Sequence, residues 1–207
     1  MKIVLAIAGS VLMALTTPAS ACERDMPAGS GAMVRAGADH DARLLDAAVL
    51  AEANYHRCRA GLAPLRPAAG LAGVARRHSR WMARVQRMSH RSRLQGLATL
   101  RQRLDASGLS IRRGAENIAL AYRFRLAGQR LRRSEPARCV FVDTSGQRLS
   151  PHSYASLARR IAADWMNSPD HRANMLDPRL TRAGHGAALA ADAPYCGQFY
   201  ATQILAD

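Results

Sequence analysis

The sequence predicts an α+β sandwich, in which helices that come first pack against strands that come last. Apolar residues recur at helical spacing over residues 42–60, 68–86 and 153–167. Residues 184–190 and 198–205 instead have the short, bounded pattern of strands. Because strands do not alternate with helices along the chain, this order favours an α+β arrangement over a doubly wound parallel sheet.

The first predicted helix, residues 42–60, carries Leu45 and Val49 on its apolar stripe. Asp39 or Asp41 is suited to cap its start, and Gly61 ends it. The second helix, residues 68–86, has an apolar side and places most of its arginines elsewhere on the wheel. The apolar side includes Leu71, Val74, His78 and Met82.

A third helix is expected over residues 94–106, where Gly108 stops it. Residues 123–150 are polar, rich in arginine and without a clear period, and they are expected to be irregular. The fourth helix, residues 153–167, ends at Ser168 because the residue before a proline disfavours the helical conformation.

The first 21 residues have the features of an export signal. Lys2 precedes an apolar run, and Ala19-Ser20-Ala21 supplies a small-x-small cleavage site. The run is shorter than the about 20 residues that span a membrane, so no transmembrane segment is expected after cleavage. Residues 22–41 are expected to be a flexible leader, and residues 42–207 the globular domain.

The chain is strongly basic, with 30 Lys and Arg against 15 Asp and Glu. Loss of Lys2 with the signal leaves 29 minus 15, a net charge of +14, carried by arginine alone. Arginine favours phosphate and carboxylate partners. Dispersed arginines, few aromatic residues and export disfavour nucleic acid, and an anionic envelope surface is the expected partner class. An arginine bias without any one partner is the alternative.

Four cysteines remain after cleavage, and an even count in an oxidising compartment predicts two disulfides. Three pairings stay open, and at least one bond is expected to involve Cys196 next to the last strand. Cys22 would be the first mature residue, which raises a lipid anchor as the alternative to a secreted or periplasmic protein. The candidates are Cys22, Cys58, Cys139 and Cys196.

Several short motifs occur in a fixed order from about residue 44 to 205, and this series resembles the bacterial, SCP-like branch of the CAP superfamily of cysteine-rich secretory and pathogenesis-related proteins. The motifs are Asn54-Tyr55-His56-Arg57, Gly61-Leu62-Ala63-Pro64-Leu65, Met88-Ser89-His90, Gly114-Ala115-Glu116-Asn117-Ile118-Ala119, the run from Trp165 to Leu176, Gly184-His185-Gly186 and Tyr200-Ala201-Thr202-Gln203.

The resemblance implies an α-β-α sandwich of about four helices around a small C-terminal antiparallel sheet, with residues 123–150 as an insertion. It places His90 and Glu116 in a polar cleft. The second acidic residue of the eukaryotic members is missing here, where Ser168 stands, and Tyr200 replaces their second histidine. His171 lies in the Ser-Pro-x-His-Arg segment that is typical of bacterial relatives.

These residue types allow two kinds of chemistry. A histidine and a carboxylate within reach can act as general base and acid. Two histidines and one carboxylate also suit a divalent metal, so His90, His171 and Glu116 are candidate zinc ligands. His78 and Asn117 complete the predicted cleft. Each also has a structural interpretation, His78 as a buried core histidine and Asn117 as a loop-binding amide.

Two functions follow as hypotheses. The first is a non-catalytic extracytoplasmic binding module for a small or lipid-like ligand, which the polar cleft without an evident nucleophile favours. The second is a metal-dependent hydrolase of peptides or envelope polymers. Neither the Gly-x-Ser-x-Gly nor the His-Glu-x-x-His motif occurs in the sequence. Whether the protein is an enzyme is left open, with binding favoured.

Overall fold

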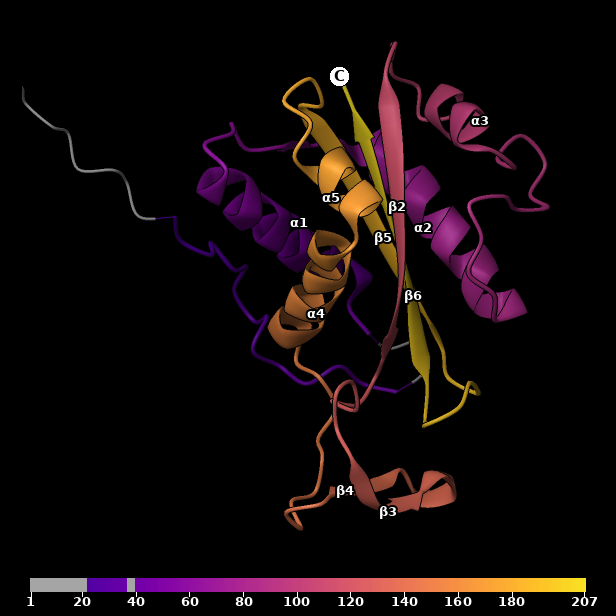
Figure 1. Ribbon diagram of the computed structural model, residues 1–207. Helices are drawn as coiled ribbons and strands as arrows, with labels where there is room; N and C mark the ends of the chain where they lie inside the picture. The colour runs from indigo at the N-terminus through magenta and orange to yellow at the C-terminus, as the bar shows by residue number, and fades with distance from the viewer. Residues whose placement is uncertain (1–21, 37–39) are drawn as a thin grey trace, which may run out of the picture.

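The computed structural model describes residues 22–36 and 40–207, so the predicted signal peptide lies outside the described residues. It confirms the α+β class (Figure 1). The elements are α1 (Ala42–Arg59), β1 (Arg66–Pro67), α2 (Ala69–Val85), α3 (Leu100–Asp105), β2 (Gly114–Tyr122), β3 (Leu131–Glu135), the 3-10 turn η2 (Pro136–Arg138), β4 (Val140–Asp143), α4 (Tyr154–Asn167), α5 (Pro169–Met175), β5 (Arg182–Ala190) and β6 (Gln198–Ala206). None of the described helices is long and apolar enough to cross a membrane.

The main sheet has the strand order β1-β5-β6-β2. β5 and β6 form the predicted antiparallel pair, β2 lies antiparallel on the other side of β6, and the short β1 runs parallel to β5. The sequence did not predict β2. Its run of consecutive buried residues includes the polar pair Glu116 and Asn117, so the strand lacks the alternation that would have marked it.

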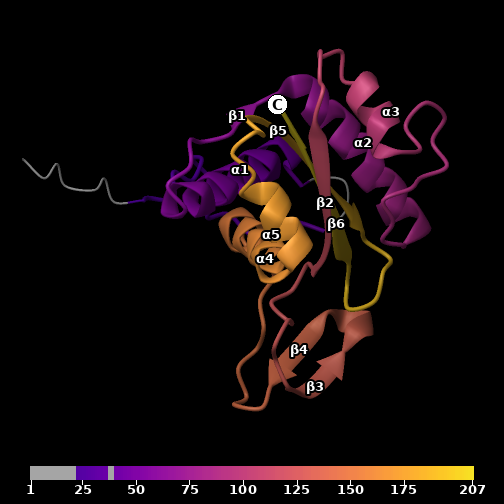
Figure 2. The same ribbon diagram turned by 45° about the horizontal axis from the view of Figure 1, so that its top comes forward.

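Helices cover both faces of the sheet, as an α-β-α sandwich requires. α2 and α3 lie on one face, and α1, α4 and α5 lie on the other (Figures 1 and 2). The larger apolar core fills the α1–α4 side, around Leu45, Ile161 and Trp165. A second cluster, around Leu71 and Ile204, fills the α2 side. β2 is an edge strand of the sheet. It contacts α3 on one face and α4 and α5 on the other.

α2 packs on β5 at the glycines of Gly184-His185-Gly186. A Cβ at Gly186 would lie 2.3 Å from the amide nitrogen of Arg76. Because this nitrogen belongs to the helix backbone, no change of side-chain rotamer can relieve the clash. The sandwich can therefore close to this spacing only where the strand carries no side chain.

We expect Gly186→Ala to lower the free energy of unfolding by about 1–3 kcal/mol or more, because α2 must shift to admit the methyl group. Gly73→Ala is the matched control. A Cβ at this position of α2 meets nothing within 4 Å, and the change should raise stability by about 0.5–1 kcal/mol. Urea unfolding measures both, and equal stabilities of the Gly186 variant and the wild type would contradict the close approach.

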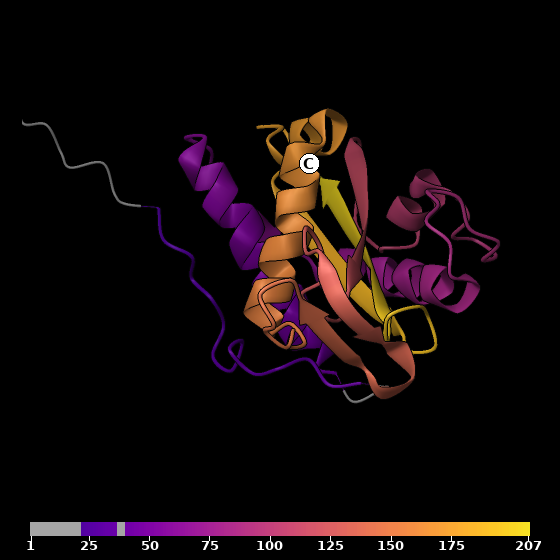
Figure 3. The ribbon, with the colours of Figure 1, turned by 60° about the horizontal axis from the view of Figure 1, so that its bottom comes forward.

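The segment expected to be irregular, residues 123–150, contains a small antiparallel sheet. β3 and β4 pair with each other and form an arm beyond the end of the main sheet (Figures 1 and 2), and Figure 3 turns this arm toward the viewer. The arm has its own apolar cluster, which includes Phe124 and Phe141. The prediction failed here because this cluster is too small to impose a strand period on an arginine-rich sequence.

The four cysteines form two disulfides, Cys22–Cys58 and Cys139–Cys196, which settles the choice among three pairings. The expected involvement of Cys196 is confirmed, although its partner lies in the β3–β4 arm and not in the body of the domain. The bond fastens this arm to the turn before β6.

The segment predicted as a flexible leader is joined to the domain over its described residues, 22–36. Besides the disulfide of Cys22, Arg24 forms an ion pair with the buried Glu52 of α1, at 3.0 Å from Nε to Oε2. Val34 is buried in the α1–α4 core. Each of these contacts is made by a single residue, so neither the composition of the segment nor a periodic pattern could have predicted them.

Two helix predictions need correction. α3 begins at Leu100 and not near residue 94, because Thr99 and Gln102 form a capping box that starts the helix there. A further helix, α5, follows Pro169, where the sequence predicted only an end. Proline disfavours the helix before it but is well suited to the first turn of the next one.

Candidate ligand-binding cleft

Glu116 is the central residue of the predicted cleft, and it is bound from several sides. It lies on β2 and faces the α2 layer, with a residue exposure of 6%. Arg103 of α3 donates from Nε to Oε2 at 2.8 Å and from Nη2 to Oε1 at 2.7 Å. His90 places its Nδ1 2.9 Å from the same Oε1. Both carboxylate oxygens are therefore already engaged within the protein.

Arg103 was not among the predicted site residues, yet it organises this side of the cleft. Its side chain is fully buried, and its remaining donors bind the backbone oxygens of Leu97 at 2.8 Å and His90 at 2.8 Å. It thereby fixes the loop after α2 to the carboxylate of Glu116. The chain is rich in arginine, and no local sequence pattern distinguishes Arg103 from the others. Its one signal is that it precedes Glu116, a predicted site residue, by 13 positions.

His78 is buried behind the carboxylate, and His90 lies at the surface. The Nδ1 of His78 is 3.6 Å from Oε2 of Glu116 and 3.3 Å from the hydroxyl of Thr202. Burial lowers the pKa of His78 to about 4, so the ring is neutral near pH 7. The side chain of His90 is 54% exposed. With a proton on Nδ1 bound to Glu116, His90 presents Nε2 to solvent.

Asn117 follows Glu116 on the strand and so faces the other layer. Its Nδ2 donates to the backbone oxygen of His171 at 3.0 Å and to Oε1 of Gln203 at 2.9 Å. Its Oδ1 accepts from Nδ2 of Asn174 at 2.9 Å. This amide therefore holds α5 against the sheet, and through the backbone it sets the position of His171.

His90 and His171 come from opposite layers and meet at the edge strand β2. Their ring centroids lie 6.5 Å apart. Partial burial, and secondarily the proximity of His90, lowers the pKa of His171. The predicted site therefore has two imidazoles at the edge of the sheet, and one of them contacts the Arg103–Glu116 pair. All five predicted cleft residues belong to this region, but His78 and Asn117 are interior and structural in their contacts.

A zinc site with Glu116 as a direct ligand does not fit this arrangement. A metal would have to displace a buried guanidinium from the carboxylate, which would leave a buried charge unpaired. Within residues 22–36 and 40–207, no group of three His, Cys, Asp or Glu side chains has the spacing of a metal site. A smaller set of ligands does fit a metal, namely the imidazoles of His90 and His171. Glu116 would then orient the ring of His90 through Nδ1 without binding the metal itself.

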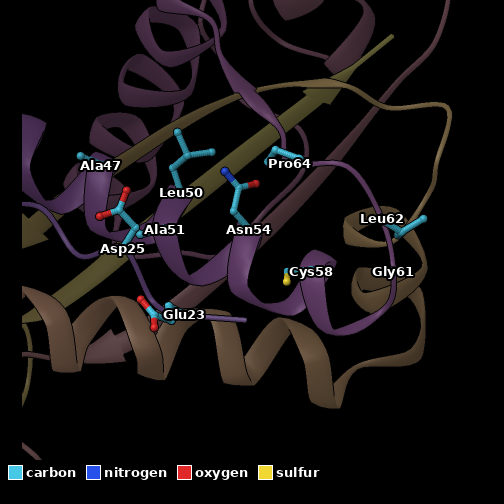
Figure 4. Close-up of a pocket in the computed structure, with 10 residues that line it drawn as sticks. All are labelled: Glu23, Asp25, Ala47, Leu50, Ala51, Asn54, Cys58, Gly61, Leu62 and Pro64. Atoms are coloured by element: carbon cyan, nitrogen blue, oxygen red, sulfur yellow. The ribbon is translucent and has the colours of Figure 1, made fainter. Parts of the chain in front are cut away.

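A separate cavity of about 590 Å³ lies along α1, between this helix and the residues that follow Cys22 (Figure 4). Leu50 and Ala51 give it an apolar wall, and the carboxylates of Glu23 and Asp25 line it as well. It includes none of the histidines of the cleft. The cavity therefore combines an apolar wall with two carboxylates, whereas the predicted site at the sheet edge presents imidazole rings.

The fold and the cleft define a disulfide-bonded α-β-α sandwich with a polar site at the sheet edge. The family model described as the cysteine-rich secretory protein family, CAP, matches residues 50–205, and the chain belongs to this family.

Solved structures share the fold. An extracellular protein containing a SCP domain from Bacillus anthracis is 24% identical over 80% of this chain, with a TM-score of 0.53, and the match covers 41% of that protein. An outer surface protein from Borrelia burgdorferi is 14% identical over 77% of this chain and 89% of that chain, with a TM-score of 0.52. The chain thus spans about two fifths of the first of these proteins. A search of curated proteins finds no match.

Proposed function

We propose that the protein is an exported, non-catalytic binding module whose cleft takes a small polar or amphipathic ligand. The observation that carries the proposal is the state of Glu116. Both of its oxygens already accept hydrogen bonds from Arg103, so the carboxylate has little capacity left to bind a substrate or a metal. The four cysteines are all in disulfides, which removes them as nucleophiles. His90 and His171 are then the groups that meet a ligand.

Export is supported by the signal-like residues 1–21 and by the disulfides, which persist in oxidising compartments. The similar protein from Bacillus anthracis is described as extracellular. The Sγ of Cys22 is bonded to Cys58, so in this state it is not available for a lipid thioether. This favours a secreted or periplasmic protein over a lipid-anchored one.

The cleft is tested by NMR titration of histidine-labelled protein with a lipid extract and a soluble polar extract of the cell envelope. We expect one extract to shift the ring signals of His90 and His171 and to leave those of the buried His152 unchanged. His90→Ala combined with His171→Ala should weaken binding at least about tenfold, which corresponds to about 1.4 kcal/mol.

The α1 cavity is the other place where a ligand could bind, and a variant of its wall tells the two sites apart. Ala51→Phe fills its wall and should leave binding at the histidines intact. If Ala51→Phe abolishes binding while the histidine variant binds normally, the ligand occupies the α1 cavity and the proposal for the cleft is wrong.

The second candidate is a metal-dependent hydrolase, which the pairing of His90 with His171 favours. A zinc ion on these two imidazoles would leave positions open for water and substrate, and when bound it would polarise a carbonyl oxygen. Glu116 would orient His90 through Nδ1 and hold its tautomer.

We expect zinc binding to be weak, because only two side chains act as ligands, and to weaken further as the pH falls through the titration range of histidine. Calorimetric titration of the wild type against the variant with His90→Ala and His171→Ala measures it. Equal binding by both proteins would place the metal elsewhere, and hydrolysis of peptides by the zinc-loaded wild type alone would favour the enzyme.

A further inference from the structure

The outer face of α2 and the loop that follows it form a surface of unpaired arginines, which we call the α2 arginine face. Sequence residues 53–104 contain no Asp or Glu. Within the described part of the chain, six exposed arginines of α2 and this loop form no side-chain hydrogen bond or ion pair. They are Arg77, Arg80, Arg84, Arg87, Arg91 and Arg93.

The acids that come nearest in sequence or structure do not neutralise this face. Asp105 binds Arg101 of its own helix, and Asp46 of α1 binds Arg76. Six positive charges held together without partners repel one another, and they are tolerated most readily where an anionic surface neutralises them.

The face is not purely polar. Two shallow hollows of about 250 Å³ and 240 Å³ lie between the arginines, and both include Trp81. Leu94 lines one of them, and Val85 lines the other and is 43% exposed. Each hollow therefore combines guanidinium groups with apolar walls, which matches a phosphodiester joined to an apolar body better than a fully polar polyanion.

The face points outward, on the layer opposite α1 and α4 (Figures 1 and 2). It is therefore separate from the α1 cavity. α2 rises about 1.5 Å per residue, so Arg77, Arg80 and Arg84 extend over roughly 10 Å along the helix. Arg87 follows beyond the end of the helix and lengthens the face.

We propose that the α2 arginine face docks the protein on an anionic phospholipid bilayer of the cell envelope. The guanidinium groups bind lipid phosphates, and Val85 and the rim of Trp81 contact the boundary of the acyl chains. This interaction does not use His90, Glu116 or His171, and it adds a membrane surface to the proposed binding function. Arginine suits the role because its planar donors bind phosphate oxygens in pairs.

The test is sedimentation with vesicles of equal parts phosphatidylglycerol and phosphatidylcholine. The wild type should bind these vesicles, release them at high salt and ignore pure phosphatidylcholine. A variant with Arg77→Gln, Arg80→Gln and Arg84→Gln should bind about a hundredfold more weakly, because each arginine near such a surface contributes about 1 kcal/mol.

The matched control removes the same charge elsewhere, through Arg43→Gln, Arg130→Gln and Arg148→Gln. These arginines are exposed and lie on α1 and on the arm. The control should bind vesicles within about threefold of the wild type, a smaller loss that screening of distant charges explains. The circular dichroism of both variants should match that of the wild type, since none of the six side chains is buried.

Quenching by brominated phosphatidylglycerol gives a second readout. It should dim Trp81, which lines both hollows although only 5% of the residue is exposed, and spare Trp165, which lies on the other face of the sheet. Equal loss of binding in both triple variants, or tight binding of soluble polyphosphate without binding of vesicles, would overturn the proposal. Loss of cleft ligand with normal vesicle binding would refute only the proposed cleft function.

Discussion

Replacing Arg103 with methionine is expected to lower the free energy of unfolding by about 3–5 kcal/mol. Methionine keeps the length of the side chain but removes the guanidinium donors to Glu116 and to the backbone oxygens of Leu97 and His90. The buried side chain of Glu116 would then lack its cationic partner, and removing one partner of a buried pair is far more costly than removing both.

Arg101→Met is the matched control, on the same helix. Its pair with Asp105 is exposed on both sides, so the loss should be less than about 1 kcal/mol. Adding Glu116→Leu to Arg103→Met should restore part of the stability, because the uncompensated charge disappears. Urea unfolding measures all four proteins. A loss as small as that of Arg101→Met would show that the pair does not hold this side of the fold together.

Acidification from pH 6.5 to 4 is expected to lower the stability steeply. Burial lowers the pKa of His78 and His152 to about 4 and that of His185 to about 3. Below pH 6.5 the unfolded chain therefore binds protons that the folded protein does not, so stability is lost as the pH falls. Asp46 has the opposite effect. Burial raises its pKa to about 7, so between pH 6.5 and 4 the folded protein binds a proton at Asp46 that the unfolded chain does not.

For these four groups the net difference is two protons, three minus one, which corresponds to a slope of about 3 kcal/mol per pH unit. His185→Gln should reduce this slope by about half, because it removes one of the two net protons. His185 is fully enclosed, with Nε2 accepting from Gln203 at 2.9 Å. Unfolding free energies at a series of pH values test the prediction, and a flat profile between pH 6.5 and 4.5 would refute it.

The helices that pack by a broad apolar stripe were predictable from the sequence. α1, α2 and α4 lie within one or two residues of their expected bounds, and β5 and β6 agree nearly as well. β2 was missed because it carries two residues of the candidate site, Glu116 and Asn117, which are polar yet buried and so hide the strand. A site at a sheet edge disturbs the same pattern that would reveal the strand.

The residues of the candidate site were predictable from the sequence, but the hydrogen bonds and ion pairs among them were not. The motifs selected His90, Glu116 and His171, and the structure brings His90 to both of the others. Arg103 escaped prediction because a buried ion pair depends on the packing of α3 against β2, which no local spacing encodes. Its presence changes the chemistry, since it uses the carboxylate that a metal or a substrate would need.

The most direct test of the proposed cleft is an analysis of what the protein carries when it is purified from its native envelope. Mass spectrometry of the denatured protein would identify a released organic ligand, and elemental analysis would give the zinc content. We expect an organic molecule in near-equal amount to the wild-type protein, its loss when His90 and His171 are replaced with alanine, and little zinc. Stoichiometric zinc in the wild type, without any organic molecule, would contradict the binding module.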